Sequence, residues 1–404
     1  MKWGVWGLVA LACACQRKQG ATEPMTQPVT SSLPRGEESN LCSRPTRPSA
    51  SVMPLGVCHA DLGDPLTAAR KFYDRQEYSK ALSCATKWTA LMPEDPQGHS
   101  ERAAALAALG NLEAAQLAYS RALALAPDQL DALLGAAHLF AVRLPSSRER
   151  DELAALYSEK GLALAKREGD QKLVEQFALL SAMAFNDLGE SQRAYERAEE
   201  ALQLGPNNTD ARYERGLALF ELCRFGEATL AFRSLLEDPE HRARAHHQLG
   251  LLRERNGQFQ EAERHFAQAR QLSPDDFLEI SLPSPDAFKA EVAKAVRALP
   301  ADMQRDLSGV PVKAEELPSD ADLRSSEPPL SPAILGLFRG PPLGEDCPPG
   351  SDGTCRSVAL YRRNLAHAVR SPEELLEQIR TTLLHEIGHL RGEDDPELAA
   401  RGLE

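Results

Sequence analysis

Small residues, aromatic residues and a proline recur about every 34 residues between positions 62 and 276. The recurring residues, copy by copy, are Ala69, Ala81 and Pro93; Gly110, Ala115, Tyr119, Ala122 and Pro127; Gly189, Ala194, Ala201 and Pro206; Gly216, Phe232 and Leu235; and Gly250, Gly257, Ala262, Phe266, Ala269 and Pro274. Small residues let two helices approach closely, and a proline ends a helix. A further copy, between about 129 and 173, carries roughly eleven extra residues around Pro145. The spacing predicts an all-α solenoid of about six helix pairs over residues 63–278.

The pattern resembles the tetratricopeptide repeat, in which each unit is a pair of antiparallel helices. The resemblance covers about half of the chain and implies a superhelix whose concave groove binds a protein or peptide partner. The alternative is an array that serves only as a spacer and folding scaffold. The net charge of −13 argues against nucleic acid as a partner, because phosphate binding needs clustered cations.

A second strong signal is the pattern His-Glu-x-x-His at residues 385–389. Residues four apart lie on one face of a helix, so His385 and His389 can direct two imidazole nitrogens to one Zn²⁺. Glu386 lies one step round the helix, where it can act as the general base toward a water held by the metal. The motif therefore predicts two metal ligands and a catalytic base.

The residues after this motif predict a third ligand. Gly392 permits a sharp turn just beyond the helix, so the chain can return a carboxylate to the metal. Asp395 is the favoured ligand and Asp394 is the alternative. The full pattern is HExxHxxGxxD, which predicts three protein ligands and an open coordination position.

The helix that carries the motif is expected to begin at Ser371, with Pro372 in its first position and Glu374 completing a capping box. It is expected to continue to Leu390. One apolar stripe is predicted to face a core, and its members are Leu376, Ile379, Leu383, Ile387 and Leu390. The two histidines lie on the opposite, polar side, which favours a metal site over a structural role in a core.

Residues 280–404 are expected to form a separate small α+β domain. A helix is predicted from Ser284, a short one between Pro300 and Leu307, and β-rich stretches at 309–312, 334–340 and 357–361. The long helix with the motif is expected to close the domain. The ordered segments AVRALP, LGLFRGPPL, ALYRRNL and TTLLHEIGH resemble the small bacterial zincin-like metallopeptidases, loosely called MMP-like.

This resemblance implies a Zn²⁺ cofactor and hydrolysis of a peptide substrate, with the strand before the long helix pairing with the extended peptide. Tyr361 and Arg362 are candidates for stabilising the oxyanion. Cross-strand packing of Tyr361 and a solvated charge at Arg362 are the favoured interpretations. The alternative function is a repeat-based envelope adaptor whose zincin domain is weak or inactive.

The N-terminus predicts export and lipid attachment. Lys2 precedes an apolar run, residues 3–12, that is too short for a permanent membrane span. Small residues then precede Cys13 and Cys15, so residues 1–15 resemble a bacterial lipoprotein signal peptide, with Cys15 favoured as the lipidated residue. Asp follows neither cysteine, so the resemblance implies an outer-membrane lipoprotein of the cell envelope, facing the periplasm or the surface.

Residues 16–62 are rich in Pro, Ser and Thr and are expected to form a disordered tether. Within it, Cys42 and Cys58 are a candidate disulfide in an oxidising envelope. The sequence as a whole predicts a zinc peptidase anchored to a membrane, with repeats that recruit a partner or substrate.

The remaining cysteines divide into two groups. Cys347 and Cys355 flank a Pro/Gly-rich loop and form the favoured disulfide, because a loop of this composition has no fold of its own. Cys84 and Cys223 lie within the repeats and are expected to be small buried residues.

Overall fold

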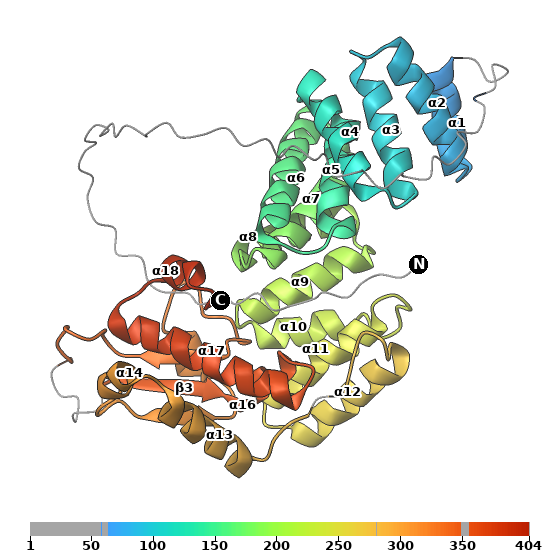
Figure 1. Cartoon of the computed structure of the whole chain (residues 1–404). Coiled ribbons are helices and arrows are strands. Elements are labelled where there is room, and N and C mark those ends of the chain that lie inside the picture. Colours follow the sequence, from blue (N-terminus) through green and yellow to red (C-terminus); the bar gives the residue numbers. More distant parts are fainter. Residues whose placement is uncertain (1–57, 59–63, 280, 349–354, 404) are drawn as a thin grey trace, which may run out of the picture.

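The structure, a computed structural model, describes residues 58, 64–279, 281–348 and 355–403. Its larger part is a solenoid of antiparallel helix pairs that ends against a small α+β domain (Figure 1). The pairs within the described residues are α1 (Pro65–Asp74) with α2 (Tyr78–Leu91), α3 (Pro96–Ala108) with α4 (Leu112–Leu125), α5 (Leu130–His138) with α6 (Arg148–Glu168), α7 (Gln171–Asp187) with α8 (Ser191–Leu204), α9 (Thr209–Glu221) with α10 (Phe225–Arg233), and α11 (Arg242–Arg255) with α12 (Phe259–Leu272). The predicted fold class is confirmed.

The third pair absorbs the extra residues that were predicted around Pro145. Helix α5 continues into a π-helical turn, Leu139–Arg143, and α6 is 21 residues long. Ser147 starts α6, since its hydroxyl accepts a hydrogen bond from the backbone N–H of Arg150 at 3.2 Å. The stack continues beyond this pair, because α6 packs directly against α7.

A contact between a glycine and an aromatic ring on a neighbouring helix recurs along the solenoid. The pairs are Gly135 with Tyr119, Gly161 with Phe177, Gly216 with Phe232, and Gly250 with Phe266. In each pair, a Cβ atom added to the glycine would overlap the ring. The missing side chain thus lets adjacent helices approach closely, as the repeat pattern predicted.

The C-terminal domain combines a three-stranded sheet with short and long helices. Its elements are α13 (Pro285–Ala298), α14 (Ala301–Asp306), β1 (Val312–Glu315), α15 (Asp320–Leu323), β2 (Gly336–Arg339), β3 (Ser357–Tyr361), α16 (Arg362–His367), α17 (Pro372–Arg391) and α18 (Asp395–Ala400). Helix α17 carries the His-Glu-x-x-His motif. The expectation that this helix closes the domain is wrong, because α18 follows it and packs Leu398 against Gly388.

The strands are arranged in the order β1-β3-β2, with β1 parallel and β2 antiparallel to β3. Both edges of β3 are therefore occupied, and the expectation that this strand pairs with a substrate is wrong. Strand β2 lies at an edge of the sheet and next to α17. Strand β1 begins only at Val312, beyond most of the predicted stretch, because Pro311 has no N–H to donate to the ladder.

The two faces of β3 pack against different partners. Val358 and Leu360 belong to the apolar core beneath α13 and α17. Ala359 and Tyr361 point the other way, into a cluster that includes Cys223 from the turn between α9 and α10. Part of the sheet is therefore covered by the solenoid itself.

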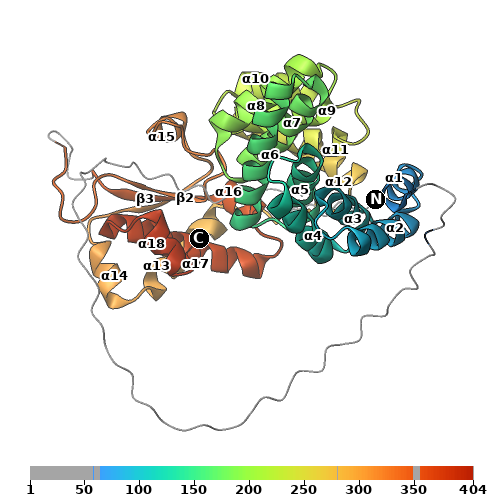
Figure 2. The same ribbon diagram turned by 90° about the horizontal axis from the view of Figure 1, so that it is seen from above.

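Charged and aromatic side chains complete the junction between the two parts. Glu254 on α11 accepts a hydrogen bond from Arg363 Nη1 at 2.5 Å and lies 2.7 Å from His367 Nε2, both on α16. The ring of His367 packs against Phe266 and His247. Burial lowers the pKa of His247 to about 3, so this ring is neutral. The C-terminal domain thus caps the last repeat, while α1 and α2 lie at the far end of the solenoid (Figures 1 and 2).

The apolar stripe of α17 differs from the prediction at its first turn. Leu376 is 38% exposed, whereas Leu375 is 6% exposed and occupies the core. Leu375 shares this core with Leu365 of α16, a helix that packs against α17. The other predicted members, Ile379, Leu383 and Ile387 among them, are buried.

Two disulfides lie within the described residues, Cys58–Cys84 and Cys347–Cys355, with Cα atoms 4.9 and 5.9 Å apart. The second joins the two cysteines favoured from the sequence. The first contradicts the candidate pairing of Cys58 with Cys42 and bonds Cys58 instead to Cys84, which is buried as expected. The reason is that Cys58 packs against the core of the first helix pair, beside Cys84.

Cys223 is buried and free, as expected. Cys13, Cys15 and Cys42 lie outside the described residues, with the predicted signal peptide and nearly all of the predicted tether. Lipid attachment therefore stays a prediction. Among the described helices, none combines the length and the apolar character that crossing a membrane requires.

Candidate metal centre

The helix that carries the motif is fixed at both ends. The Ser371 hydroxyl accepts a hydrogen bond from the backbone N–H of Glu374 at 3.1 Å, and Pro372 is the first helical residue. The Glu374 carboxylate accepts from the N–H of Arg370 at 2.7 Å and not from that of Ser371, so only half of the expected capping box forms. Gly392 ends the helix with a φ of 90°, which glycine adopts readily.

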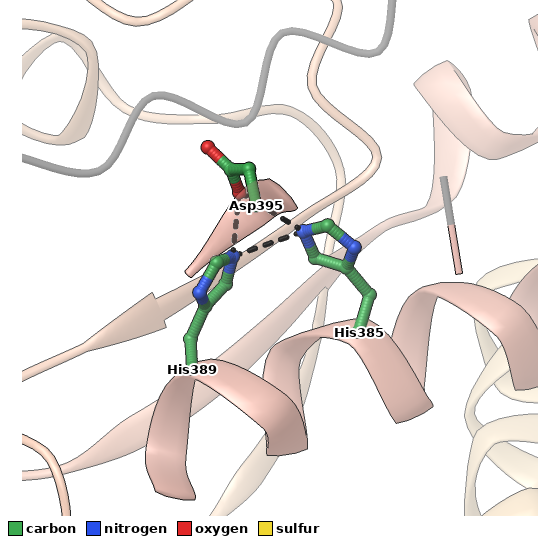
Figure 3. A group of neighbouring side chains, drawn as sticks. All are labelled: His385, His389 and Asp395. Atoms are coloured by element: carbon green, nitrogen blue, oxygen red, sulfur yellow. Dashed lines mark hydrogen bonds and ion pairs between the residues drawn. The ribbon is translucent and has the colours of Figure 1, made fainter. Parts of the chain in front are cut away.

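The structure brings His385, His389 and Asp395 together (Figure 3). The Nε2 atoms of the two histidines are 2.9 Å apart, and Asp395 Oδ1 lies 3.7 and 3.3 Å from them. Ligands of one tetrahedral Zn²⁺, bound at about 2.0–2.1 Å, lie about 3.3 Å from one another. The three atoms therefore have the spacing of a metal ligand set.

Hydrogen bonds behind the imidazole rings decide which nitrogen faces the site. His385 Nδ1 lies 2.5 Å from the carbonyl oxygen of Leu403, and His389 Nδ1 lies 3.0 Å from that of Glu393. A carbonyl only accepts, so each Nδ1 carries the proton and each neutral ring presents a lone pair at Nε2. Burial also lowers the pKa of His385, which favours its neutral form.

The donor set fits a cation. Two lone pairs and a carboxylate oxygen converge on one point, and they repel one another unless a positive charge lies between them. Asp395 Oδ1 is buried and has no hydrogen-bond partner among the described residues. A buried carboxylate oxygen without a partner is costly, and coordination to a metal removes that cost. Two histidines and one carboxylate are a ligand set that suits Zn²⁺.

Glu386 lies beside this group and against the edge strand. Its side chain is 2% exposed, and its Oε2 accepts a hydrogen bond from the N–H of Phe338 on β2 at 2.6 Å. Gly336 makes this approach possible, since a Cβ there would lie 2.9 Å from Glu386 Oε1 and 2.7 Å from Thr382 Cγ2. Burial raises the pKa of Glu386 to about 7, in the range suited to a general base at neutral pH.

Asp394, the alternative third ligand, has a different role. Its side chain accepts from the N–H of Glu397 at 3.0 Å and caps α18, while Glu397 reaches back to the N–H of Asp394. Asp395 is the first residue of that helix and the one directed to the histidines.

Tyr361 and Arg362 do not belong to the group around the histidines. Tyr361 is 0% exposed, and its hydroxyl lies 3.3 Å from Arg339 Nη2 on β2, so it packs across the sheet as favoured from the sequence. Arg362 forms an ion pair with Glu316 and is 6% exposed. The expected solvated charge at Arg362 is wrong, because the residue lies under the loop that leads into α13, where the Pro283 carbonyl accepts from its guanidinium.

Comparison with known families finds a match within each part of the chain. The zincin-like metallopeptidase family matches residues 307–403, and tetratricopeptide repeats match residues 179–243 and 243–276. The chain carries tetratricopeptide repeats and a C-terminal zincin-like metallopeptidase domain. The family match to the zincin-like domain contains the whole His-His-Asp group.

Several solved structures are similar to the solenoid. YrrB, described as a TPR protein with an unusual peptide-binding site, is 23% identical, covers 47% of this chain and 93% of its own, and gives a TM-score of 0.38. PilW, described as a type IV pilus biogenesis factor, is 19% identical over 52% and 93%, with a TM-score of 0.43. PilF of Pseudomonas aeruginosa is 15% identical over 56% and 96%, also at 0.43. Comparison with curated proteins found no match.

Proposed function

We propose that this protein is a zinc-dependent peptidase of the cell envelope, in which the repeats bring a protein partner or peptide substrate to the zincin-like domain. The observation that carries the proposal is the convergence of His385, His389 and Asp395 beside Glu386. The family match supports the reaction class.

The residues of the site divide the chemistry between them. Bound Zn²⁺ supplies a Lewis acid for a peptide carbonyl and acidifies water towards a pKa of about 7. His385, His389 and Asp395 would hold it through Nε2, Nε2 and Oδ1. The Phe338 N–H fixes Glu386 Oε2, which leaves Oε1 to take a proton from water and pass it to the departing amine.

Strand β2 is the element that we assign to substrate binding, in place of β3. The carbonyl of Leu335, just before β2, accepts a hydrogen bond from the N–H of Tyr361 on β3. Bonded and non-bonded positions alternate along an antiparallel pair, so the odd-numbered residues of β2 bond to β3. The N–H of Phe338 therefore points away from β3. An extended peptide added along this edge would lie beside Glu386 and the metal ligands.

Two observations support a location in the envelope. The disulfides Cys58–Cys84 and Cys347–Cys355 form in oxidising compartments. The small residues before Cys13 and Cys15 fit a lipidation signal. We infer that the chain is anchored through one of these cysteines, and mass spectrometry of the membrane-extracted protein tests for the diacylglyceryl group.

Zinc binding and hydrolysis test the proposed reaction on the full-length protein. We expect about one zinc per chain and cleavage of members of a peptide library. Glu386→Gln is expected to keep zinc affinity within about threefold and to lower the cleavage rate by at least about 100-fold, because it removes the proton acceptor. Glu377→Gln, a solvent-exposed change on the same helix, is the matched control and should alter neither.

The outcomes separate the two functions under consideration. Loss of zinc in Glu386→Gln would contradict the assigned role of Glu386, and normal zinc binding in His385→Ala would contradict the site. A wild-type protein that binds zinc and cleaves no library member, while its repeats capture an envelope protein, would favour the adaptor function instead.

A further inference from the structure

The third ligand reaches the metal centre from a separate, very short helix. Asp395 is the first of six residues in α18, and a helix of that length is not stable by itself. The position of its carboxylate therefore depends on how residues 392–403, called here the closing segment, are attached to α17.

One side-chain contact joins the closing segment to the middle of the motif. Leu398 is 0% exposed and lies directly over Gly388, where an added Cβ would overlap Leu398 Cδ2 and lie 3.3 Å from Glu393 Oε2. The His-Glu-x-x-His pattern leaves residue 388 unspecified. Here that residue is the surface on which α18 rests, and it lies one residue before His389.

The backbone of the closing segment also contacts both histidines from behind. The Glu393 carbonyl holds His389 Nδ1 at the start of the segment, and the Leu403 carbonyl holds His385 Nδ1 at its end. Leu403 N donates to the Leu398 carbonyl at 3.1 Å, which ties the end of the segment to the same leucine. A shift of Leu398 would therefore move the ligand Asp395 and also the Leu403 carbonyl, which orients the ligand His385.

We propose that Gly388 and Leu398 are positioning residues of the metal centre: their contact sets the entry of Asp395 and the orientation of His385, and so determines zinc affinity. The inference rests on the zinc site proposed above. Neither residue offers a ligand atom to the metal, so their effect passes through the closing segment. Changes to groups that orient metal ligands commonly lower affinity by about 10–100-fold.

A double-mutant cycle on the full-length protein tests this contact. Gly388→Ala adds a methyl group where Leu398 lies, and Leu398→Ala removes that side chain. Each single variant is expected to lower zinc affinity by about 10–100-fold in competition with a chromophoric chelator. The double variant is expected to bind zinc at least about threefold more tightly than the single variant with the lower affinity, because the added methyl group partly fills the space that Leu398 vacates.

Two further variants and an absorption spectrum test whether Gly388 and Leu398 act on the metal ligands or only on the stability of the fold. Leu398→Met conserves volume and should stay within about threefold of the wild type. Gly226→Ala, where an added Cβ meets no atom within 4 Å, is the matched glycine control. The absorption spectrum of the Co²⁺-loaded protein should change in Leu398→Ala and return in Leu398→Met.

Each outcome has one meaning. Unchanged zinc affinity and cobalt spectrum in folded Leu398→Ala would overturn the inference and leave the zinc site standing. Failure of the wild type to bind zinc would instead remove the proposed function. If Gly388→Ala does not fold, the comparison of Leu398→Ala with Leu398→Met decides alone.

Discussion

The solenoid and the zincin-like domain use the same kind of contact in different ways. In the solenoid, Gly161 lies under the ring of Phe177, and similar glycine–aromatic contacts recur in other repeats. In the zincin-like domain, Gly388 lies under Leu398 in a contact that is not repeated along a stack. Loss of one contact in the solenoid weakens an interface between neighbours. Loss of the contact at Gly388 is expected to displace a metal ligand.

This difference separates stability from function along one chain. Repeat contacts are local, so their energies add approximately as a series of neighbouring interfaces. The metal centre depends on contacts that each occur once, between α17, β2 and the closing segment. Damage to the solenoid should therefore lower stability without changing zinc affinity, whereas damage at Gly388 should lower zinc affinity.

Glu254 links the solenoid to the zincin-like domain, and its loss is expected to have the largest effect on stability. It accepts from Arg363 and contacts His367, and its side chain is 7% exposed. Glu254→Ala removes the buried partner of the Arg363 guanidinium, which keeps the partly exposed Glu316 and the ring of Phe259. We expect a loss of about 3 kcal/mol in the free energy of unfolding, at the low end for a broken buried ion pair. Urea denaturation followed by circular dichroism measures it.

A control on α12 gives this prediction its scale. Glu263 pairs with Arg270 at the surface, so Glu263→Ala should cost at most about 1 kcal/mol. We also expect the Glu254→Ala unfolding curve to split into two transitions, because the zincin-like domain loses part of its attachment. A single, unshifted transition would show that the two parts are not coupled through this ion pair.

The parts predicted from sequence are those with local signatures. The repeats carry a period, and Ser371, Pro372 and Gly392 mark helix ends through their residue types. The metal ligands were predicted because chemistry restricts residue type and helix geometry restricts spacing. The disulfide partner of Cys84 was missed because the short segment before α1 has no periodic pattern that places it.

The supporting contacts could not be predicted for a different reason. Glu393 and Leu403 act through backbone carbonyls, which any residue supplies, so their side chains carry no signal. Gly388 and Leu398 form a contact whose spacing matches no regular period. Glu254 and Arg363 are 109 residues apart, and only the folded chain brings them together.

Gly161→Ala tests the solenoid side of the comparison. The added methyl group would overlap the Phe177 ring between α6 and α7, so we expect a loss of about 1–3 kcal/mol in the free energy of unfolding. Zinc affinity should stay within about twofold of the wild type. Gly226→Ala is the matched control and should leave stability unchanged or raise it by up to about 1 kcal/mol, since its added Cβ meets open space. A changed zinc affinity in Gly161→Ala would contradict the separation.

Glu214 gives the solenoid a pH dependence of its own. It is buried in α9, where Asn186 Nδ2 donates to its Oε2 at 2.8 Å. Burial raises its pKa from 4.5 to about 7, with smaller contributions from Asp187 and Asp210 and against the opposing effects of the Asn186 hydrogen bond and Arg244. Between pH 4.5 and about pH 7, Glu214 is protonated in the folded protein and ionised in the unfolded chain. The stability that the protonated carboxyl contributes below pH 4.5 is therefore lost as the pH rises through about 7.

Glu214→Gln removes that loss, because the amide stays neutral and can still accept from Asn186. The buried charge costs at most about 3 kcal/mol, and relaxation around it lowers the figure, so we expect the variant to gain about 1–2 kcal/mol over the wild type between pH 5 and pH 8. Urea denaturation at both pH values measures the difference. The solvent-exposed change Glu113→Gln should give no such gain, and zinc affinity should be unchanged in both variants. Equal stability changes for Glu214→Gln at the two pH values would mean that its carboxyl does not titrate in this range, and the pH dependence of the solenoid would then lie elsewhere.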